Sequence, residues 1–160
     1  MKRREDLRCR VSMKLHLHTS LAFNGQCEAA FRFYEQCLNG TIAFMLTWGN
    51  SPMAAEAPPG WDPKIAHATL KIGDTVITGS DVPPDRYEQP RGFELVLQMD
   101  DPATAERVFQ ALADKGRIAM PLQETFWASR FGVVVDRFGI TWSINCEGPR
   151  AAASSSTFER

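Results

Sequence analysis

The sequence has no continuous apolar run that approaches the roughly 20 residues of a membrane-spanning helix. Its first residues also lack the apolar core of a secretory signal, because two histidines and a threonine interrupt residues 15–23. The four cysteines, Cys9, Cys27, Cys37 and Cys146, form no Cys-x-x-Cys pair. Without an export signal they are expected to be reduced thiols rather than disulfides or zinc ligands. These absences favour a cytoplasmic protein with no membrane partner.

Two further absences disfavour particular types of enzymatic reaction. No glycine-rich turn joins a strand to a helix, so the chain lacks the site typical of a nucleotide-like methyl donor. The three histidines have no nucleophile-elbow context, so no Ser-His-Asp arrangement is indicated. Methyl transfer from such a donor and serine hydrolysis are therefore both disfavoured.

The beginning of the chain is basic, whereas its middle is acidic. Residues 1–12 have five basic and two acidic side chains, whereas residues 13–149 have 11 basic and 16 acidic ones, a net charge of −5. An acidic middle disfavours a nucleic-acid partner. Residues 1–13 are expected to be a disordered or mis-assigned extension upstream of the true fold. Residues 148–160, which are small and polar, are expected to be a disordered tail.

The first half of the chain predicts a strand, a helix and three more strands. Residues 15–23 alternate, with Leu17 and Leu21 among the residues of the apolar face. An apolar helical stripe follows over residues 30–38, and Asn39-Gly40 supplies the stop signal. The later strands are expected at residues 41–48, 65–72 and 75–80, the last two joined by a Gly73-Asp74 turn.

The same order recurs 76 residues further along. Residues 93–99 alternate, Asp101-Pro102 opens a helix, and its stripe runs from Ala105 to Leu112. Three more strands are expected at residues 117–120, 130–135 and 140–146. The sequence therefore predicts an α+β fold of two β-α-β-β-β modules, with curved mixed sheets around a cavity. A single domain would span residues 14–147, divided into module one (14–81), a linker (82–91) and module two (92–147).

Several motifs occur in a specific order along these modules: residues 21–25 before 28–34, then 65–73 leading to Ser80-Asp81, and residues 120–127 followed by 130–132 and 136–142. With them, the chain resembles the vicinal oxygen chelate superfamily, which includes glyoxalase I, ring-cleaving dioxygenases and bleomycin resistance proteins. Within it, the chain resembles the PhnB-like branch, long labelled 3-demethylubiquinone-9 3-methyltransferase. Because no methyl-donor loop is present, we interpret that label as a name only, which does not indicate that the chain transfers methyl groups.

The resemblance implies four positions at which metal-dependent relatives carry ligands. Here these positions are matched by His18, Thr78 (or Ser80), Glu94 and Ser143. Two of the four are hydroxyl side chains, whereas a catalytic divalent ion generally takes three stronger protein ligands. We therefore expect no cofactor. The alternative is an Fe, Mn, Ni or Zn ion held by His18, His67 and Glu94.

The predicted ligand pocket contains several further side chains. Glu94, if buried, would be a general base, and Phe126 and Trp127 beside Arg130 would form an aromatic wall with a cation for an anionic ligand. Each has a structural alternative: Trp127 seals a turn, and His18 is a half-exposed strand residue. The whole predicted pocket is His18, His67, Thr78, Ser80, Glu94, Phe126, Trp127, Arg130 and Ser143.

Two functions remain open from the sequence. The first is a metal-free protein that binds a small molecule in a cavity between the modules, as bleomycin resistance proteins do. The alternative is a metal-dependent enzyme of the superfamily, lyase-like or dioxygenase-like. The resemblance implies a homodimer in both cases.

Overall fold

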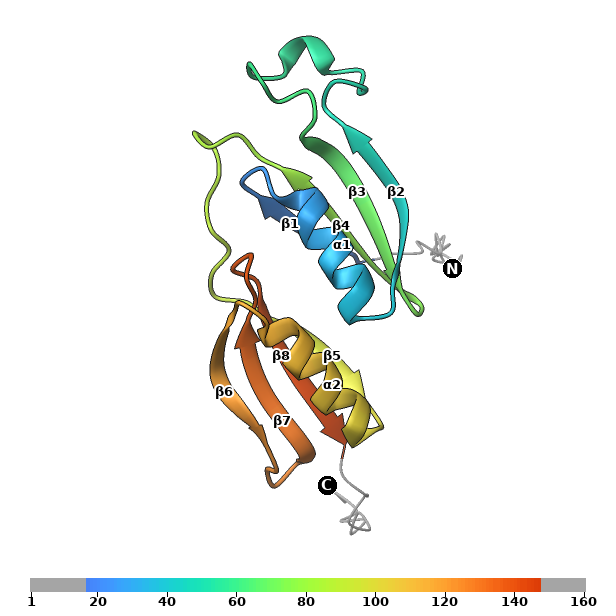
Figure 1. The fold of residues 1–160 in the computed structure, drawn as a ribbon, viewed down its shortest axis with the longest axis vertical. Coiled ribbons are helices and arrows are strands. Elements are labelled where there is room, and N and C mark those ends of the chain that lie inside the picture. The colour runs from blue at the N-terminus through green and yellow to red at the C-terminus, as the bar shows by residue number, and fades with distance from the viewer. Residues whose placement is uncertain (1–16, 148–160) are drawn as a thin grey trace, which may run out of the picture.

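The computed structural model describes residues 17–147, which form eight strands and two α-helices in two similar modules (Figure 1). The expectations for residues 1–13 and 148–160 lie outside the described residues. Module one contains β1 (Thr19–Phe23), α1 (Cys27–Cys37), β2 (Thr41–Thr47), the short 3-10 helix η1 (Ala54–Glu56), β3 (Ile65–Ile72) and β4 (Thr75–Asp81). Module two contains β5 (Leu95–Met99), α2 (Pro102–Ala113), β6 (Arg117–Gln123), β7 (Ala128–Val135) and β8 (Thr141–Glu147).

Each module has one four-stranded mixed sheet with the same strand order, β1-β4-β3-β2 in module one and β5-β8-β7-β6 in module two. The β1–β4 and β5–β8 pairs are parallel, and the other neighbours are antiparallel. The two sheets are not closed into a barrel. The predicted α+β fold of two β-α-β-β-β modules is therefore confirmed.

One helix covers one face of each sheet, and both helices lie on the same side of the molecule (Figure 1). In α2, the residues predicted for the apolar stripe are buried: Ala105, Val108, Phe109 and Leu112. In α1 the buried stripe includes Phe31, whereas Phe33 is only half-buried. Gly79 makes room for Phe31 in the buried stripe, because a Cβ at this position would lie 2.5 Å from the Phe31 ring. The bare glycine backbone leaves the space that Phe31 fills.

A buried carboxylate joins the two modules. Asp136, in the turn between β7 and β8, accepts a hydrogen bond of 2.6 Å from the hydroxyl of Tyr34 on α1. It also accepts bonds from Trp142 Nε1 and from the backbone N–H groups of Phe138 and Ile140. Burial, followed by the Asp136 carboxylate, raises the pKa of Tyr34, so the phenol stays protonated and donates. Asp136 therefore holds its own turn together and also connects the two modules.

A second buried carboxylate fixes the start of α1. The N-cap residue Gln26 makes no side-chain cap bond, and the N–H of Cys27 instead donates to Asp81 Oδ1 at 2.8 Å. The other oxygen of Asp81 accepts the N–H of Ile65 at 2.8 Å. Asp81 therefore ties the end of β4 to the start of both α1 and β3.

The first strand is shorter than predicted. β1 begins at Thr19, so Leu17 precedes it and is 95% exposed. The prediction that Leu17 belongs to a buried strand face is wrong, because the pairing with β4 starts only at Thr19. Neither α-helix in the described part of the chain has the length and apolar character needed to cross a membrane.

Candidate functional site

The candidate site is the face of each sheet that points away from its helix. Alternation along the strands sends every second side chain to this face. In module one these residues are Ser20, Ala22, Phe44, His67, Thr69, Lys71, Val76, Thr78 and Ser80. In module two they are Val96, Gln98, Met120, Phe131, Val133, Ser143 and Asn145. We call these sets the open face of module one and the open face of module two.

The internal repeat places equivalent residues in equivalent rows across the open faces. In module one the paired residues across the sheet are Ser20, Thr78, Thr69 and Phe44. In module two the corresponding row is Val96, Ser143, Val133 and Met120. The same fold therefore presents three hydroxyls and one aromatic ring in one row, and a mainly apolar row in the other.

Three of the predicted pocket residues lie together on the open face of module one. Thr78 and Ser80 alternate along β4, and the Thr78 hydroxyl donates to the carbonyl of Thr19 at 3.3 Å. His67 on β3 is exposed, lies 3.3 Å from the Thr69 hydroxyl and packs its ring near Phe44. His67, Thr78 and Ser80 therefore share one face of this sheet.

A cleft of about 670 Å³ adjoins this face at the edge of β1. Ser20 and Ala22 line it from the strand, and Gln89, Arg91 and Phe93 line it from the segment that connects the modules. Its volume falls within the range of small-molecule sites. The cleft therefore extends the open face of module one towards module two.

Glu94 lies one residue before β5 and is exposed. The general-base prediction depended on a buried carboxylate, and that environment is absent at this position. The strand begins at Leu95, so Glu94 has not yet entered the sheet. Its side chain is therefore exposed to solvent and does not act from an apolar interior.

Ser143, in contrast, is buried on the open face of module two, between its cross-strand neighbours Val96 and Val133. Its Oγ has no hydrogen-bond partner among residues 17–147. Asn145, the next residue on the same face, also has an unpartnered buried oxygen. Alternation along β8 identifies Asn145 from sequence, but nothing local reveals that its oxygen is left unpaired.

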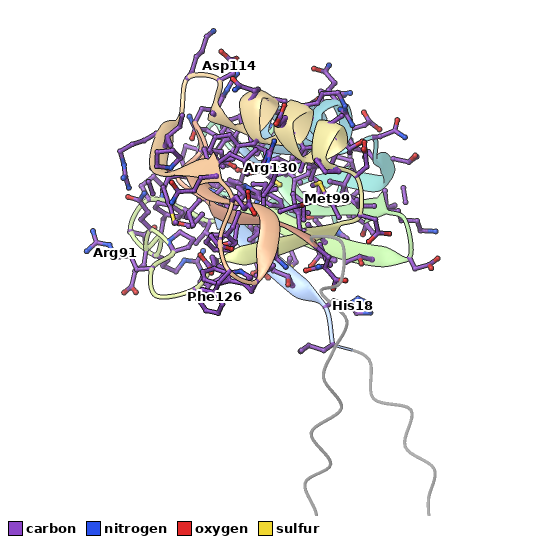
Figure 2. All side chains as sticks on the ribbon, turned by 90° about the horizontal axis from the view of Figure 1, so that it is seen from below. His18, Arg91, Met99, Asp114, Phe126 and Arg130 are labelled. Atoms are coloured by element: carbon purple, nitrogen blue, oxygen red, sulfur yellow. The ribbon has the colours of Figure 1, made fainter. Side chains whose placement is uncertain are left out.

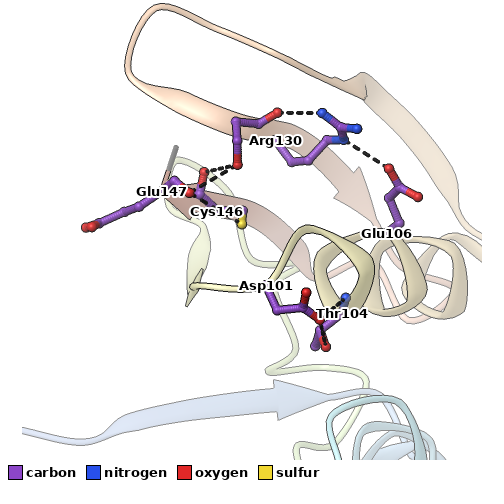
Figure 3. A network of polar contacts seen from close by, with 7 residues as sticks. Asp101, Thr104, Glu106, Arg130, Cys146 and Glu147 are labelled. Carbon is purple, nitrogen blue, oxygen red and sulfur yellow. Dashed lines mark hydrogen bonds and ion pairs between the residues drawn. The ribbon is translucent and has the colours of Figure 1, made fainter. Parts of the chain in front are cut away.

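The predicted aromatic wall separates from its predicted cation. Phe126 and Trp127 lie before β7, with ring centroids 4.5 Å apart, and Trp127 packs against Phe131 of the open face. Phe126 is 97% exposed. Arg130 lies on the opposite side of the sheet, where its guanidinium meets Glu106 of α2 at 3.0 Å (Figure 3). Figure 2 shows the same division, with Arg130 next to α2 and with Phe126 and His18 on the far side of the strands.

The donors for a metal ion are dispersed in the described structure. Ser20 and Thr69 are both level with Thr78, and His18 and His67 lie on opposite sides of that row. Ser20 and Thr69 are already about 10 Å apart across the strands, and the chain leads from them to His18 and His67 in opposite directions, so the two imidazoles lie too far apart to share one ion. No group of three His, Cys, Asp or Glu side chains gathers anywhere in residues 17–147. The set of His18, His67 and Glu94 does not fit a metal ion in this arrangement.

The described cysteines are unsuited to nucleophilic chemistry. Cys27, Cys37 and Cys146 are buried and free. Burial, with Asp81 and Glu28 nearby, raises the pKa of the Cys27 thiol, and burial also raises the pKa of Cys37. Both thiols are therefore protonated at neutral pH and behave as core residues.

Residues 16–144 match the model of the glyoxalase/bleomycin resistance protein/dioxygenase superfamily. Protein YjdN of Escherichia coli is 37% identical over 133 residues, which cover 78% of this chain and 90% of YjdN. The crystal structure of protein PA1353 from Pseudomonas aeruginosa superposes with a TM-score of 0.77 at 45% identity, covering 83% of this chain and 98% of that one. A putative 3-demethylubiquinone-9 3-methyltransferase, PhnB protein, from Bacillus cereus has the same fold, with a TM-score of 0.71, 23% identity and coverage of 82% and 99%.

Proposed function

Because the chain belongs to the glyoxalase/bleomycin resistance protein/dioxygenase superfamily, we propose that it binds a small molecule at the open faces of its two modules, without a complete metal site. The observation that carries this proposal is the composition of those faces. Neither helix packs on these faces, which carry hydroxyl, amide and aromatic side chains. The open face of module one also adjoins a cleft of about 670 Å³. The binding residues would be those of the predicted pocket that share this side: His18, His67, Thr78, Ser80, Glu94, Phe126, Trp127 and Ser143.

The proposal includes a second copy of the chain as partner. Large apolar side chains are exposed on the same side as the ligand site, among them Phe44, Val96 and Trp127. The two sheets also stay open within one chain, so a second subunit would help to enclose the ligand. A cytoplasmic location and the absence of nucleic-acid partners belong to the same proposal. The acidic balance of residues 13–149 supports the latter.

A metal-dependent enzyme is the alternative function, and metal loading separates the two. We expect chelator-treated protein that is incubated with Fe(II), Mn(II), Ni(II) or Zn(II) to retain well below one ion per chain. The reason is that Thr78 and Ser143, at two of the four matched positions, offer weak hydroxyl donors, while His18 and His67 lie too far apart. Elemental analysis after gel filtration measures the retained ion.

Three single variants serve as controls for that measurement: His18→Ala, His67→Ala and Glu94→Ala. Retention of one equivalent by the wild type, lost in each variant, would establish the metal-dependent alternative and contradict the proposal. Retention that is low and equal in all four proteins is the outcome that supports metal-free binding.

A further inference from the structure

The open face of module two contains a chain of three polar side chains that connects neighbouring strands. Asn145 on β8 donates from Nδ2 to Gln98 Oε1 on β5 at 2.8 Å. Gln98 in turn donates from Nε2 to Glu147 Oε1 at 3.1 Å. Asn145 and Gln98 are direct cross-strand partners, so the sheet register holds this chain in place. We call these three residues the amide relay.

Glu147 fixes the direction of the amide relay. An ionised carboxylate only accepts hydrogen bonds, so Gln98 must turn its NH₂ group towards Glu147 and its oxygen towards Asn145. Asn145 must then donate to that oxygen, which leaves its own Oδ1 at the far end of the relay. This oxygen is buried and has no partner among the described residues. A buried acceptor without a donor is costly, and a bound donor group would remove that cost.

Aromatic side chains lie beside this oxygen. Phe131 lies directly opposite Asn145 across the β7–β8 pair, and Trp127 packs on Phe131 at 5.3 Å between ring centroids. Ser143 Oγ, the second unpartnered atom, precedes Asn145 on the same face between two valines. The only charged member of the relay, Glu147, already accepts the bond from Gln98.

We propose that this part of the site recognises the N–H or O–H group of a neutral, ring-bearing ligand through Asn145 Oδ1. Because Asn145 Oδ1 and Ser143 Oγ are buried in the chain without a ligand, the side chains that cover them must shift on binding. The ring then packs beside Phe131 and Trp127, the ligand donor meets Oδ1, and the Ser143 hydroxyl bonds to a neighbouring polar atom of the ligand. A carboxylate or phosphate is rejected here, because it brings only acceptors to an acceptor. This inference rests on the proposed binding function and names the ligand chemistry of module two.

Benzamide and benzoate test this inference, because they have the same shape and differ in charge and in the presence of N–H donors. Titration of the full chain, followed by NMR of the Asn145 side-chain amide and the β8 backbone, gives both dissociation constants. We expect benzamide to bind at least about tenfold more tightly than benzoate, the factor associated with one hydrogen bond gained instead of an unpaired acceptor.

Glu147→Gln removes the constraint on direction without removing side-chain volume. The relay can then reverse: the introduced amide donates to Gln98, and Gln98 donates to Asn145, so that Asn145 presents its NH₂ group to the ligand. We expect the preference for benzamide over benzoate to fall by about tenfold in this variant. Glu124→Gln is the matched control, since it removes the same charge from an exposed residue on the same module and leaves the relay intact. It should keep the wild-type preference.

The outcomes separate this inference from the binding function itself. Benzoate that binds the open face as tightly as benzamide, or a preference that Glu147→Gln leaves unchanged, would overturn the donor-recognition inference and leave the proposed function standing. Failure of both probes to perturb any open-face resonance would count against both.

Discussion

Asp136→Ala is expected to destabilise the protein by about 4 kcal/mol, since it leaves several buried donors without an acceptor. The carboxylate accepts four hydrogen bonds, and those from Tyr34 and Trp142 come from fully buried side chains. Alanine can accept none of them, because its side chain has no oxygen. The loss is close to the lower end of the stability of a typical domain, about 5–15 kcal/mol. Urea denaturation followed by tryptophan fluorescence measures it.

Tyr34→Phe and Asp74→Ala serve as controls that attribute the loss of stability to the hydrogen bonds of Asp136. Tyr34→Phe removes only the hydrogen bond from the Tyr34 hydroxyl to Asp136. In the wild-type background it should lower the free energy of unfolding by about 1 kcal/mol. In the Asp136→Ala background it should cost less, because the hydroxyl has already lost its acceptor. Asp74→Ala removes an exposed carboxylate in the β3–β4 turn and should have little effect. Equal losses for Asp136→Ala and Asp74→Ala would contradict the role of Asp136.

The second large effect is expected at Asp81, whose replacement by alanine should cost about 3 kcal/mol. Two buried backbone N–H groups, those of Cys27 and Ile65, each lose a 2.8 Å bond. The helix α1 then begins without a cap, because Gln26 supplies none. Thermal unfolding and amide hydrogen exchange at Cys27 and Ile65 measure the global and local consequences.

Asp81→Asn provides a graded comparison at the same position. The amide has one acceptor oxygen in place of two, so it satisfies one N–H and points its own NH₂ group at the other. We expect a loss between those of the wild type and Asp81→Ala. A variant as stable as the wild type would show that one of the two bonds contributes nothing. Asp85→Ala, at an exposed aspartate four residues further along, should leave both α1 and β3 protected.

Local sequence patterns were sufficient for most of the fold. Asp101-Pro102 and the stripe from Ala105 to Leu112 predict α2 correctly, because capping and helical periodicity are properties of neighbouring residues. The 76-residue repeat correctly predicts two similar modules. The position of Phe31 is different: it depends on Gly79, which is distant in sequence and close in space.

The site was less predictable because it depends on pairing between distant strands. Every second residue of β7, counted back from the buried Val134, faces the helix, and Arg130 is one of these residues. The alternation of the strand therefore indicated the side on which Arg130 lies. The separation of His18 from His67 follows only from the register of β1 and β3 on β4. The unpaired oxygen of Asn145 likewise follows from the register of β5 on β8 and from the carboxylate at the end of the relay.

Binding of a small molecule at the open faces is tested most directly by NMR mapping on the chelator-treated full chain. Backbone amide shifts are recorded while a library of small neutral and aromatic compounds is added without metal. We predict that binding compounds shift amides at Ser20, Thr78, Val96 and Ser143, on the strands of the open faces, and leave the exposed helix residues Glu28 and Gln110 unchanged. Shifts confined to the helix side, or binding that appears only after a divalent metal ion is added, would contradict metal-free binding at the open faces.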